Sequence, residues 1–373
     1  MAGVILVAAG GTGGHLFPAE ALAVALTTRG WRVHLATDHR VESYGQDFPA
    51  ERIHIVPSAT ITKAPVAAAR SLLTLAGGLV KARRLVGRIA PAAAIGFGGY
   101  PTVPPILAAA WRGVPTVVHD ANAVLGRANR FLAKRATAIA TSFPAVGGLE
   151  KLSARVVETG NPVRAAVRAA AAIPYLGRWA GDPFRLLVFG GSQGARFMSD
   201  LVPPALQRMP EVLRKRVKVT QQCRPEDMER VAAAYRDMNV VAELEPFFRD
   251  LPDRIAKSHL VVCRSGASTV AELSVIGRPA IMVPLPHALD QDQKANAEVL
   301  AKAGGGWMIE QSEMTPERLA SQIMEMIGHP DRLAAAAKAA RSIGRPDAVE
   351  RLADLVERVA ARQSIRALEG QPA

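Results

Sequence analysis

The sequence predicts an α/β protein of two domains, each with a parallel β-sheet covered by helices. The chain has 373 residues, more than one hydrophobic core usually supports. Short apolar runs alternate with Ala/Leu-rich helical stretches from end to end, as in parallel sheets covered by helices. The segments VILVAAGGTGGH and RLLVFGGSQGAR also repeat one pattern, an apolar run that enters a glycine-rich turn. Two similar domains would explain this repeat.

Ten short apolar or β-branched runs are expected to be strands, because Gly/Pro punctuation or a helix start follows each. They are Val4 to Ala9, Arg32 to Thr37, Ala93 to Gly96, Thr116 to His119, Ala136 to Thr141, Arg185 to Phe189, Val217 to Gln221, Val240 to Glu243, Leu260 to Cys263 and Ala280 to Pro284. The turn Gly160-Asn161-Pro162 and the mixed stretch from Ile173 to Pro183 place the linker between the domains. Glycine loops from both domains should face an interdomain cleft, since ligands bind beyond the carboxyl ends of parallel strands.

Composition and local patterns indicate the cellular compartment and argue against a signal peptide and a membrane span. Cys223 and Cys263 are the two cysteines and have no metal-like spacing, which fits a reducing, cytoplasmic compartment. The run from Val4 to Ala9 enters glycines and reads as a core strand and not as a signal peptide. The run from Ala92 to Trp111 is uncharged, but its glycines and prolines predict strand, loop and helix and not a membrane span.

The net charge of +13 predicts attraction to an anionic partner: nucleic acid, a membrane surface or a phosphorylated substrate. Aromatic residues make up only 5% of the chain, and no RRM, KH or zinc-finger pattern occurs. The sequence therefore lacks the aromatic residues and motifs by which proteins stack on the bases of nucleic acids. A non-enzymatic anion-binding protein remains an alternative at this point.

The first glycine loop, Gly10 to His15, follows a strand and opens a helix. Free N–H groups and the positive helix end favour a phosphate or sugar diphosphate there. A tight turn is the alternative, but four glycines within five residues exceed what a turn needs. The G-x-G-x-x-G spacing fails at Leu16 and no Gly-Lys-Ser/Thr follows, which excludes a dinucleotide fingerprint and a Walker loop.

The second glycine loop, Gly190 to Arg196, repeats the pattern and adds the hydroxyl of Ser192. A further loop from Arg264 to Glu272 carries small residues that would let a ligand approach. Glu272 could accept hydrogen bonds from a ribose, or be an acid favoured by the start of a helix. The segment from Asp290 to Asn296 contains Asp-x-Asp, which we interpret as a helix N-cap and not as a metal site.

Several motifs, in this order, resemble the MurG family of bacterial N-acetylglucosaminyltransferases, which make lipid II from lipid I. They are GGTGGH, GGYPTVPP, HDAN, GNPVR, GGSQGAR, CRSGASTVAE and DQDQKANA. The resemblance runs from about Gly3 to about Met308. It implies a GT-B fold of two Rossmann-like lobes with an interlobe cleft, no cofactor and no metal. It implies an acceptor-binding, membrane-associating lobe over residues 1–163 and a UDP-N-acetylglucosamine lobe over 164–340, with a helical segment over 341–373 packing back on the first lobe.

The resemblance also implies the contacts of the donor. They are Thr12, Gly13, Gly14, Asn122, Arg164, Ser192, Phe248 through its backbone to uracil, Ala267, Ser268, Thr269, Val270, Ala271, Glu272 and Gln293. Three positions depart from the family pattern: Asp120 stands where Glu is common, Ser199 where Asn is frequent and Asp292 where Gln can occur. The shorter carboxylate of Asp120 reaches less far, which weakens its candidacy as a base.

The implied reaction is an inverting transfer to the 4-hydroxyl of the muramyl sugar of undecaprenyl-pyrophosphoryl-MurNAc-pentapeptide. Catalytic candidates are His15, His119 and Asp120, and His15 is preferred because the helix end beside it favours a neutral, proton-accepting ring. A UDP-N-acetylglucosamine epimerase of the same fold is the nearest alternative.

The implied location is the cytoplasmic face of the inner membrane, with other cell-wall synthesis proteins as compatible partners. The segment from Ile61 to Ala90 mixes leucines with Lys and Arg. It is expected to contact an anionic membrane peripherally, the alternative being a core helix with a solvated basic side.

Overall fold

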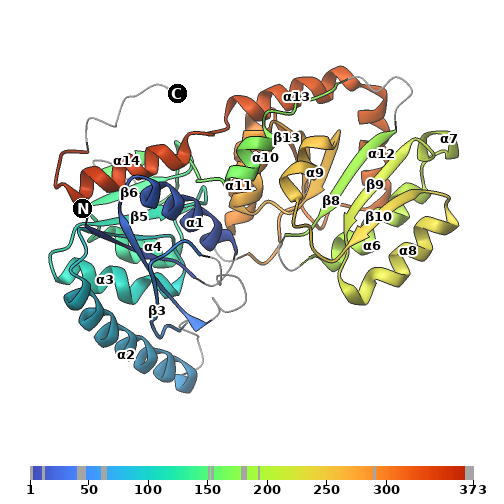
Figure 1. Cartoon of the computed structure of the whole chain (residues 1–373). Helices are drawn as coiled ribbons and strands as arrows, with labels where there is room; N and C mark the ends of the chain where they lie inside the picture. Colours follow the sequence, from blue (N-terminus) through green and yellow to red (C-terminus); the bar gives the residue numbers. More distant parts are fainter. Residues whose placement is uncertain are drawn as a thin grey trace. The chain divides into compact units, whose positions relative to one another are not determined.

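The structure is a computed structural model. It describes residues 3–10, 13–39, 48–59, 65–149, 152, 155–177, 183–191, 194–288 and 291–365. The chain divides into two compact units, one made of Met1–Arg164 with Arg345–Ala373 and the other of Ala165–Gly344. Each unit is an α/β domain with one parallel sheet (Figure 1). The predicted fold class is confirmed.

The first unit has a seven-stranded parallel sheet in the order β3-β2-β1-β4-β5-β6-β7. Its strands are β1 (Val4–Ala8), β2 (Arg32–Thr37), β3 (Arg52–Ile55), β4 (Ala93–Gly96), β5 (Thr116–Asp120), β6 (Ala138–Thr141) and β7 (Val156–Glu158). Its helices are α1 (Gly13–Thr28), α2 (Pro65–Ile89), α3 (Val103–Trp111), α4 (Arg127–Ala133) and α14 (Ala348–Ala360), with a 3₁₀ turn η2 (Tyr100–Thr102). The stretch from Ala92 to Trp111 is strand, loop and helix as expected.

The sheet of the first unit is covered on both faces. One buried cluster joins α1 and α14 to the sheet, and another joins α2 and α3 to its other side. The last helix therefore packs beside the first, although they lie at opposite ends of the chain (Figure 1). Glu158 at the end of β7 holds the chain that leads into α14: its carboxylate pairs with Arg345 at 3.2 Å, and its carbonyl accepts a bond from Arg351 at 2.9 Å.

The second unit has a six-stranded sheet in the order β10-β9-β8-β11-β12-β13. Its strands are β8 (Phe184–Phe189), β9 (Val217–Gln222), β10 (Val241–Glu245), β11 (Leu260–Cys263), β12 (Ala280–Met282) and β13 (Gly306–Met308). Its helices are α5 (Ala165–Ala170), α6 (Arg196–Gln207), α7 (Glu211–Arg214), α8 (Met228–Asp237), α9 (Leu251–Lys257), α10 (Ala267–Ile276), α11 (Asp292–Lys302), α12 (Pro316–Gly328) and α13 (Pro330–Ser342), with a 3₁₀ turn η4 (Pro225–Asp227).

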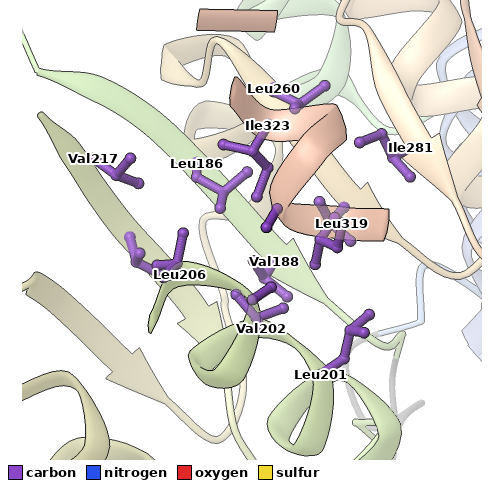
Figure 2. Close-up of a cluster of buried hydrophobic side chains, with 14 of the residues drawn as sticks. Leu186, Val188, Leu201, Val202, Leu206, Val217, Leu260, Ile281, Leu319 and Ile323 are labelled. Atoms are coloured by element: carbon purple, nitrogen blue, oxygen red, sulfur yellow. The ribbon is translucent and has the colours of Figure 1, made fainter. Parts of the chain in front are cut away.

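The core of the second unit lies between its sheet and helices α6 and α12. Figure 2 shows Leu186 and Val188 of β8 facing Val202 of α6 and Leu319 and Ile323 of α12. These side chains are at most 1% exposed. Burial of each is worth roughly 1.5–3 kcal/mol, so this cluster fixes the strands whose ends carry the candidate site.

Each of the ten predicted strands is present, with shifts of one or two residues at several ends. Three strands, β3, β7 and β13, were not predicted. Two further expectations were wrong in detail. Residues from Ala267 to Glu272 belong to helix α10 and not to a loop, and α11 begins at Asp292 with Gln291 as its N-cap, so no described Asp caps it.

Candidate functional site

The candidate residues of each unit gather where parallel strands end. In the first unit, Gly10 follows β1, Gly98 follows β4, His119 and Asp120 end β5, and Gly160 follows β7. Carboxyl ends of parallel strands meet at one edge of a sheet, where ligands of this architecture bind. Thr12 lies outside the described residues.

His15 stands on the first turn of α1, beside two glycines that follow β4. A Cβ on Gly98 would lie 3.5 Å from His15 Nε2, and one on Gly99 would lie 3.4 Å from His15 Cε1. Both glycines have positive φ, 88° and 75°, a conformation that other residues rarely adopt. The ring is only half-buried. The GGYP motif therefore provides the surface against which the ring of His15 packs.

His119 is fully buried and its Nε2 lies 3.2 Å from the carbonyl oxygen of Gly160. Because a carbonyl can only accept, Nε2 carries the proton and Nδ1 does not. Burial lowers the pKa of His119 to about 4, the bond to Gly160 opposes that shift, and the charge of His15 adds to it. His119 is thus neutral at pH 7 and lies within the electrostatic reach of His15.

Asp120 is 2% exposed and both of its carboxylate oxygens are occupied. Oδ1 accepts a bond from the Asn122 N–H at 3.0 Å, while Oδ2 accepts from the Gly126 N–H at 2.8 Å and from Asn129 Nδ2 at 3.0 Å. Burial raises the pKa of Asp120, although these bonds oppose the shift. This geometry suits a residue that shapes the loop from Asn122 to Asn129, and so positions Asn122, better than one that meets a substrate.

Arg164 and Gly13 both contact the ring of Phe17. The guanidinium carbon of Arg164 lies 4.2 Å from the ring centre of Phe17, and a Cβ on Gly13 would approach the same ring to 3.0 Å. Gly14, the next residue, is exposed. The structure thus brings Arg164 to the start of α1, where a helix favours anions.

Asn161 was not among the predicted site residues. It is 5% exposed, and neither its Nδ2 nor its Oδ1 has a hydrogen-bond partner among the described residues. An unpaired buried amide is costly, so it marks a place where a ligand or water would bond. The Asn-Pro turn between Gly160 and Arg164 was the available signal, and it was interpreted only as a turn.

In the second unit, the glycine loop after β8 is held by Gln222 at the end of β9. Gln222 Oε1 accepts from the Gly190 N–H at 3.0 Å, and its Nε2 donates to the carbonyls of Gly191 at 2.9 Å and Pro246 at 3.2 Å. A Cβ on Gly190 would lie 2.4 Å from the backbone nitrogen of Ala195, so only glycine fits there. Ser192, the predicted hydroxyl donor, lies outside the described residues.

Helix α10 begins without a side-chain cap, because its N-cap is Gly266. Ser268 Oγ on its first turn is buried and has no partner within the described chain. Ala267, Thr269 and Ala271 are half-buried. Val270 is fully buried and Glu272 is 7% exposed, so Val270 can offer a ligand only its backbone.

Gln293 is joined to the start of α10 and to the turn after β12. Its backbone carbonyl accepts from Ser265 Oγ at 2.8 Å, and its side-chain Oε1 accepts from the Leu285 N–H at 3.1 Å. Arg264 Nη1 donates to the carbonyl of Pro284 at 3.1 Å, which fixes the same turn. With Oε1 engaged, the Nε2 of Gln293 is the group left to donate to a ligand.

Phe248 and Ser199 are both buried and packed against neighbouring side chains. Phe248 is 5% exposed and lies beneath the guanidinium of Arg254, which is 4.4 Å from its ring centre. Ser199, a departure from the family pattern, is fully buried, with Oγ 3.6 Å from Cys223 Sγ. Among the residues that the structure describes, no group of three or more His, Cys, Asp or Glu could hold a metal ion.

Family models match both parts of the chain. Residues 5–141 match the glycosyltransferase family 28 N-terminal domain, and residues 185–358 match the glycosyltransferase family 28 C-terminal domain. A relative from Rhodopseudomonas palustris is 57% identical over 96% of this chain and 98% of its own length. One from Rhizobium etli is 55% identical over 97% of each chain. Both are named UDP-N-acetylglucosamine–N-acetylmuramyl-(pentapeptide) pyrophosphoryl-undecaprenol N-acetylglucosamine transferase.

Solved structures agree with this match. MurG of Acinetobacter baumannii has a TM-score of 0.76 and 29% identity, and the alignment covers 96% of this chain and all of the other. The UDP-GlcNAc 2-epimerase from Neisseria meningitidis bound to UDP-GlcNAc has a TM-score of 0.68 and 14% identity, over 95% of this chain and 100% of its own. At that identity the epimerase shares the fold alone.

Proposed function

Since the chain belongs to glycosyltransferase family 28, we propose that it transfers N-acetylglucosamine from UDP-N-acetylglucosamine to lipid I. The product is lipid II, the disaccharide-linked precursor of peptidoglycan. The identity of the relatives over nearly the whole chain supports this activity. The position of His15, half-buried at the strand ends beside Gly98 and Gly99, is the observation that carries the mechanism.

The reaction is a single displacement at the anomeric carbon. His15 takes the proton of the acceptor's 4-hydroxyl as its oxygen bonds to that carbon, and the bond from the carbon to the UDP oxygen breaks with its electron pair. His15 is the base because it is half-buried, whereas His119 and Asp120 are at most 2% exposed. His119 and Asp120 then hold the surrounding backbone.

The departing diphosphate needs positive potential already in place. Arg164 supplies a charge held over Phe17 beside the start of α1. Thr12, Gly13, Gly14 and Asn122 complete the donor contacts of the first unit, and Ser192 adds a hydroxyl from the glycine loop of the second. These assignments come from the family resemblance, and the fixed geometry of Arg164 is consistent with them.

The sugar nucleotide is bound mainly by the second unit, at residues 165–344. The uncapped start of α10, with the unpaired hydroxyl of Ser268, offers donors to phosphate or sugar. Glu272 and the Nε2 of Gln293 bond the nucleoside end, and the backbone of Phe248 meets uracil. The acceptor is bound mainly by the first unit.

A peripheral membrane contact through α2 is also part of the proposal. Leu72 and Leu73 are 63% and 74% exposed. A groove of about 570 Å³ between α2 and β3 is lined by Lys81, Arg84 and Arg88 together with His54 and apolar side chains, and no carboxylate of the described residues lines it. Apolar area flanked by several cations favours an anionic lipid surface. Within the described chain, no helix is long and apolar enough to cross a bilayer. The proposed location is the cytoplasmic face of the inner membrane.

The decisive experiment supplies labelled UDP-N-acetylglucosamine with and without lipid I. We expect labelled lipid II only when lipid I is present, and an unchanged sugar nucleotide without it. Conversion of the sugar nucleotide in the absence of acceptor, with no labelled lipid, would instead support an epimerase. A protein that binds the nucleotide but changes neither substrate would refute both enzymatic functions.

A further inference from the structure

The side chain of Arg254 on α9 lies among three carboxylates and one aromatic ring. Its Nε donates to Asp250 Oδ1 at 2.7 Å, its Nη1 to Glu243 Oε1 at 2.7 Å and its Nη2 to Glu245 Oε1 at 3.0 Å. The guanidinium plane covers Phe248, with 4.4 Å between its carbon and the ring centre. All three nitrogens of one side chain are thus used within the stretch from Glu243 to Arg254.

This cluster restrains geometry more than it adds stability. The three carboxylates are 40–52% exposed, and ion pairs of that exposure are worth little individually. The Arg254 side chain itself is only 16% exposed. Burial would lower the pKa of Arg254, but its bonds to Asp250 and Glu243 and their charges outweigh burial and raise it. A planar group with fixed partners on β10 and at the N-cap of α9 therefore sets the path of the chain between them.

The connecting segment from Pro246 to Asp250 is held at its other end as well. Gln222 donates to the Pro246 carbonyl while it bonds both glycines of the loop after β8. Phe248, in the middle, is 5% exposed and cannot move without leaving the guanidinium. The backbone of Phe248 is consequently oriented by the fixed ends of the segment and by the stacking of its ring against Arg254.

We infer that Arg254 is a positioning residue that gives the enzyme its preference for uracil over cytosine. The inference rests on the proposed function, in which the backbone at Phe248 meets the base. Uracil offers an N3–H donor and an O4 acceptor, and cytosine offers the reverse pattern at the same two positions. A backbone N–H and C=O can distinguish the two bases only if their directions are fixed, since the mismatched base leaves polar groups unpaired.

The test compares binding of UDP and CDP by calorimetry in the wild-type chain and in Arg254→Met. This change keeps the length of the side chain but removes the charge and the planar fork. We expect UDP to bind about tenfold more weakly, the size of one hydrogen bond, while CDP binding changes less than about threefold. In the transfer assay the donor KM should rise and kcat should stay within about threefold, because the base is remote from the reacting carbon. Arg254→Lys should recover part of the UDP preference.

The matched control is Lys257→Met, which removes a charge from the same helix. Lys257 pairs with Asp253 at 2.6 Å across one exposed turn, so its loss should leave both nucleotide affinities unchanged. Should Arg254→Met fail to fold, Phe248→Leu removes the ring beneath the guanidinium while keeping the ion pairs, and the same loss of preference is expected.

An Arg254→Met protein that folds and keeps the wild-type ratio of UDP to CDP affinity would overturn the inference. So would a wild-type protein that forms lipid II yet binds both nucleotides equally, and in that case the proposed function would stand. A wild-type protein that prefers UDP, and loses that preference in Arg254→Met, but forms no lipid II would instead refute the proposed reaction and leave the role of Arg254 supported.

Discussion

Arg164 covers the ring of Phe17, with 4.2 Å between its guanidinium carbon and the ring centre. Arg164 ends the Gly-Asn-Pro-Val-Arg segment after β7, whereas Phe17 belongs to the start of α1. Two distant parts of the first unit thus meet at the loop that we propose for the donor diphosphate. The ring also packs closely on Gly13, so it holds the cation and the helix start in one arrangement.

Phe17→Leu should therefore raise the donor KM. The change removes a cation–π contact worth about 1 kcal/mol, which corresponds to a rise of about fivefold. Its control is Phe131→Leu, which removes a looser contact with Arg135 at 5.6 Å. Steady-state kinetics with a detergent-solubilised acceptor would measure both variants. An unchanged donor KM in Phe17→Leu would contradict the proposal that Arg164, held by Phe17, binds the donor.

His15→Ala should lower kcat while leaving the donor KM within a few-fold. Loss of a general base typically costs about 10²- to 10⁴-fold in rate, and at least the lower value is expected. His119→Gln is the comparison, because its glutamine can still donate to the Gly160 carbonyl. If His15→Ala keeps near-normal kcat across pH while His119→Gln loses it, the base belongs to the His119 and Asp120 pair.

Changes at Glu272 and Gln293 should act on donor binding and not on chemistry. Gln293→Glu keeps the oxygen that accepts from Leu285 but replaces the Nε2 donor, and Glu272→Ala removes a buried carboxylate. Each should raise the donor KM about tenfold and leave kcat within about threefold. The lost contacts are equally strong in the bound substrate and in the transition state, so their loss weakens binding without slowing the chemical step. The opposite pattern, a normal KM with a collapsed kcat, would contradict their assignment to the nucleoside end.

The buried His119 should make the protein less stable in acid. Its pKa is about 4 in the fold, against an ordinary histidine value of 6.5, so the unfolded chain takes up a proton first as pH falls. The stabilising contribution is complete above pH 6.5 and is lost towards pH 4, by roughly 3 kcal/mol at most. Melting curves of the wild type and of His119→Gln across this window would measure it. Equal pH slopes in the two proteins would show that His119 does not titrate this way.

Membrane association should depend on the exposed leucines of α2. The double change Leu72→Ser and Leu73→Ser removes apolar area at residues 63% and 74% exposed, so co-sedimentation with anionic vesicles should fall. Binding of the wild type should also weaken as salt rises, because basic side chains contribute about 1 kcal/mol each near anionic lipid. Val212→Ser, at a residue 77% exposed in the second unit, is the control. Equal binding to neutral and anionic vesicles would argue against the charge-based part of the proposal.

Strand prediction succeeded at the centre of each sheet and at the edge strand β10, and it failed at the other three edges. The missed strands β3, β7 and β13 are all edge strands, and each has only three or four residues. Central strands are buried on both faces and therefore appear as continuous apolar runs. The edge strand β3 lacks that signal: Arg52 and His54 alternate with isoleucines, and none of its four residues is buried.

The place of the glycine loops and of His15, each after a strand and at or near the start of a helix, could be predicted because residue types and spacing carry that signal locally. Gln222, Arg254 and Asn161 could not. Gln222 and Arg254 act through partners that lie up to 32 residues away and belong to other elements, and Asn161 is notable only because its buried amide has no partner among the described residues. A single glutamine or arginine in a sequence is far more often a solvated surface residue.

The placement of α14 has a consequence for how the protein is made. Leu352, Leu355, Val356 and Val359 complete the core that begins with β1 and α1. The ribosome synthesises these residues after all of the second unit. Until then the nascent first unit carries an uncovered apolar face, the kind of surface that aggregates or engages chaperones. Folding of the first unit is therefore complete only after the whole second unit has been synthesised, and a transcript cut short before Ala348 would yield a chain with an uncovered core.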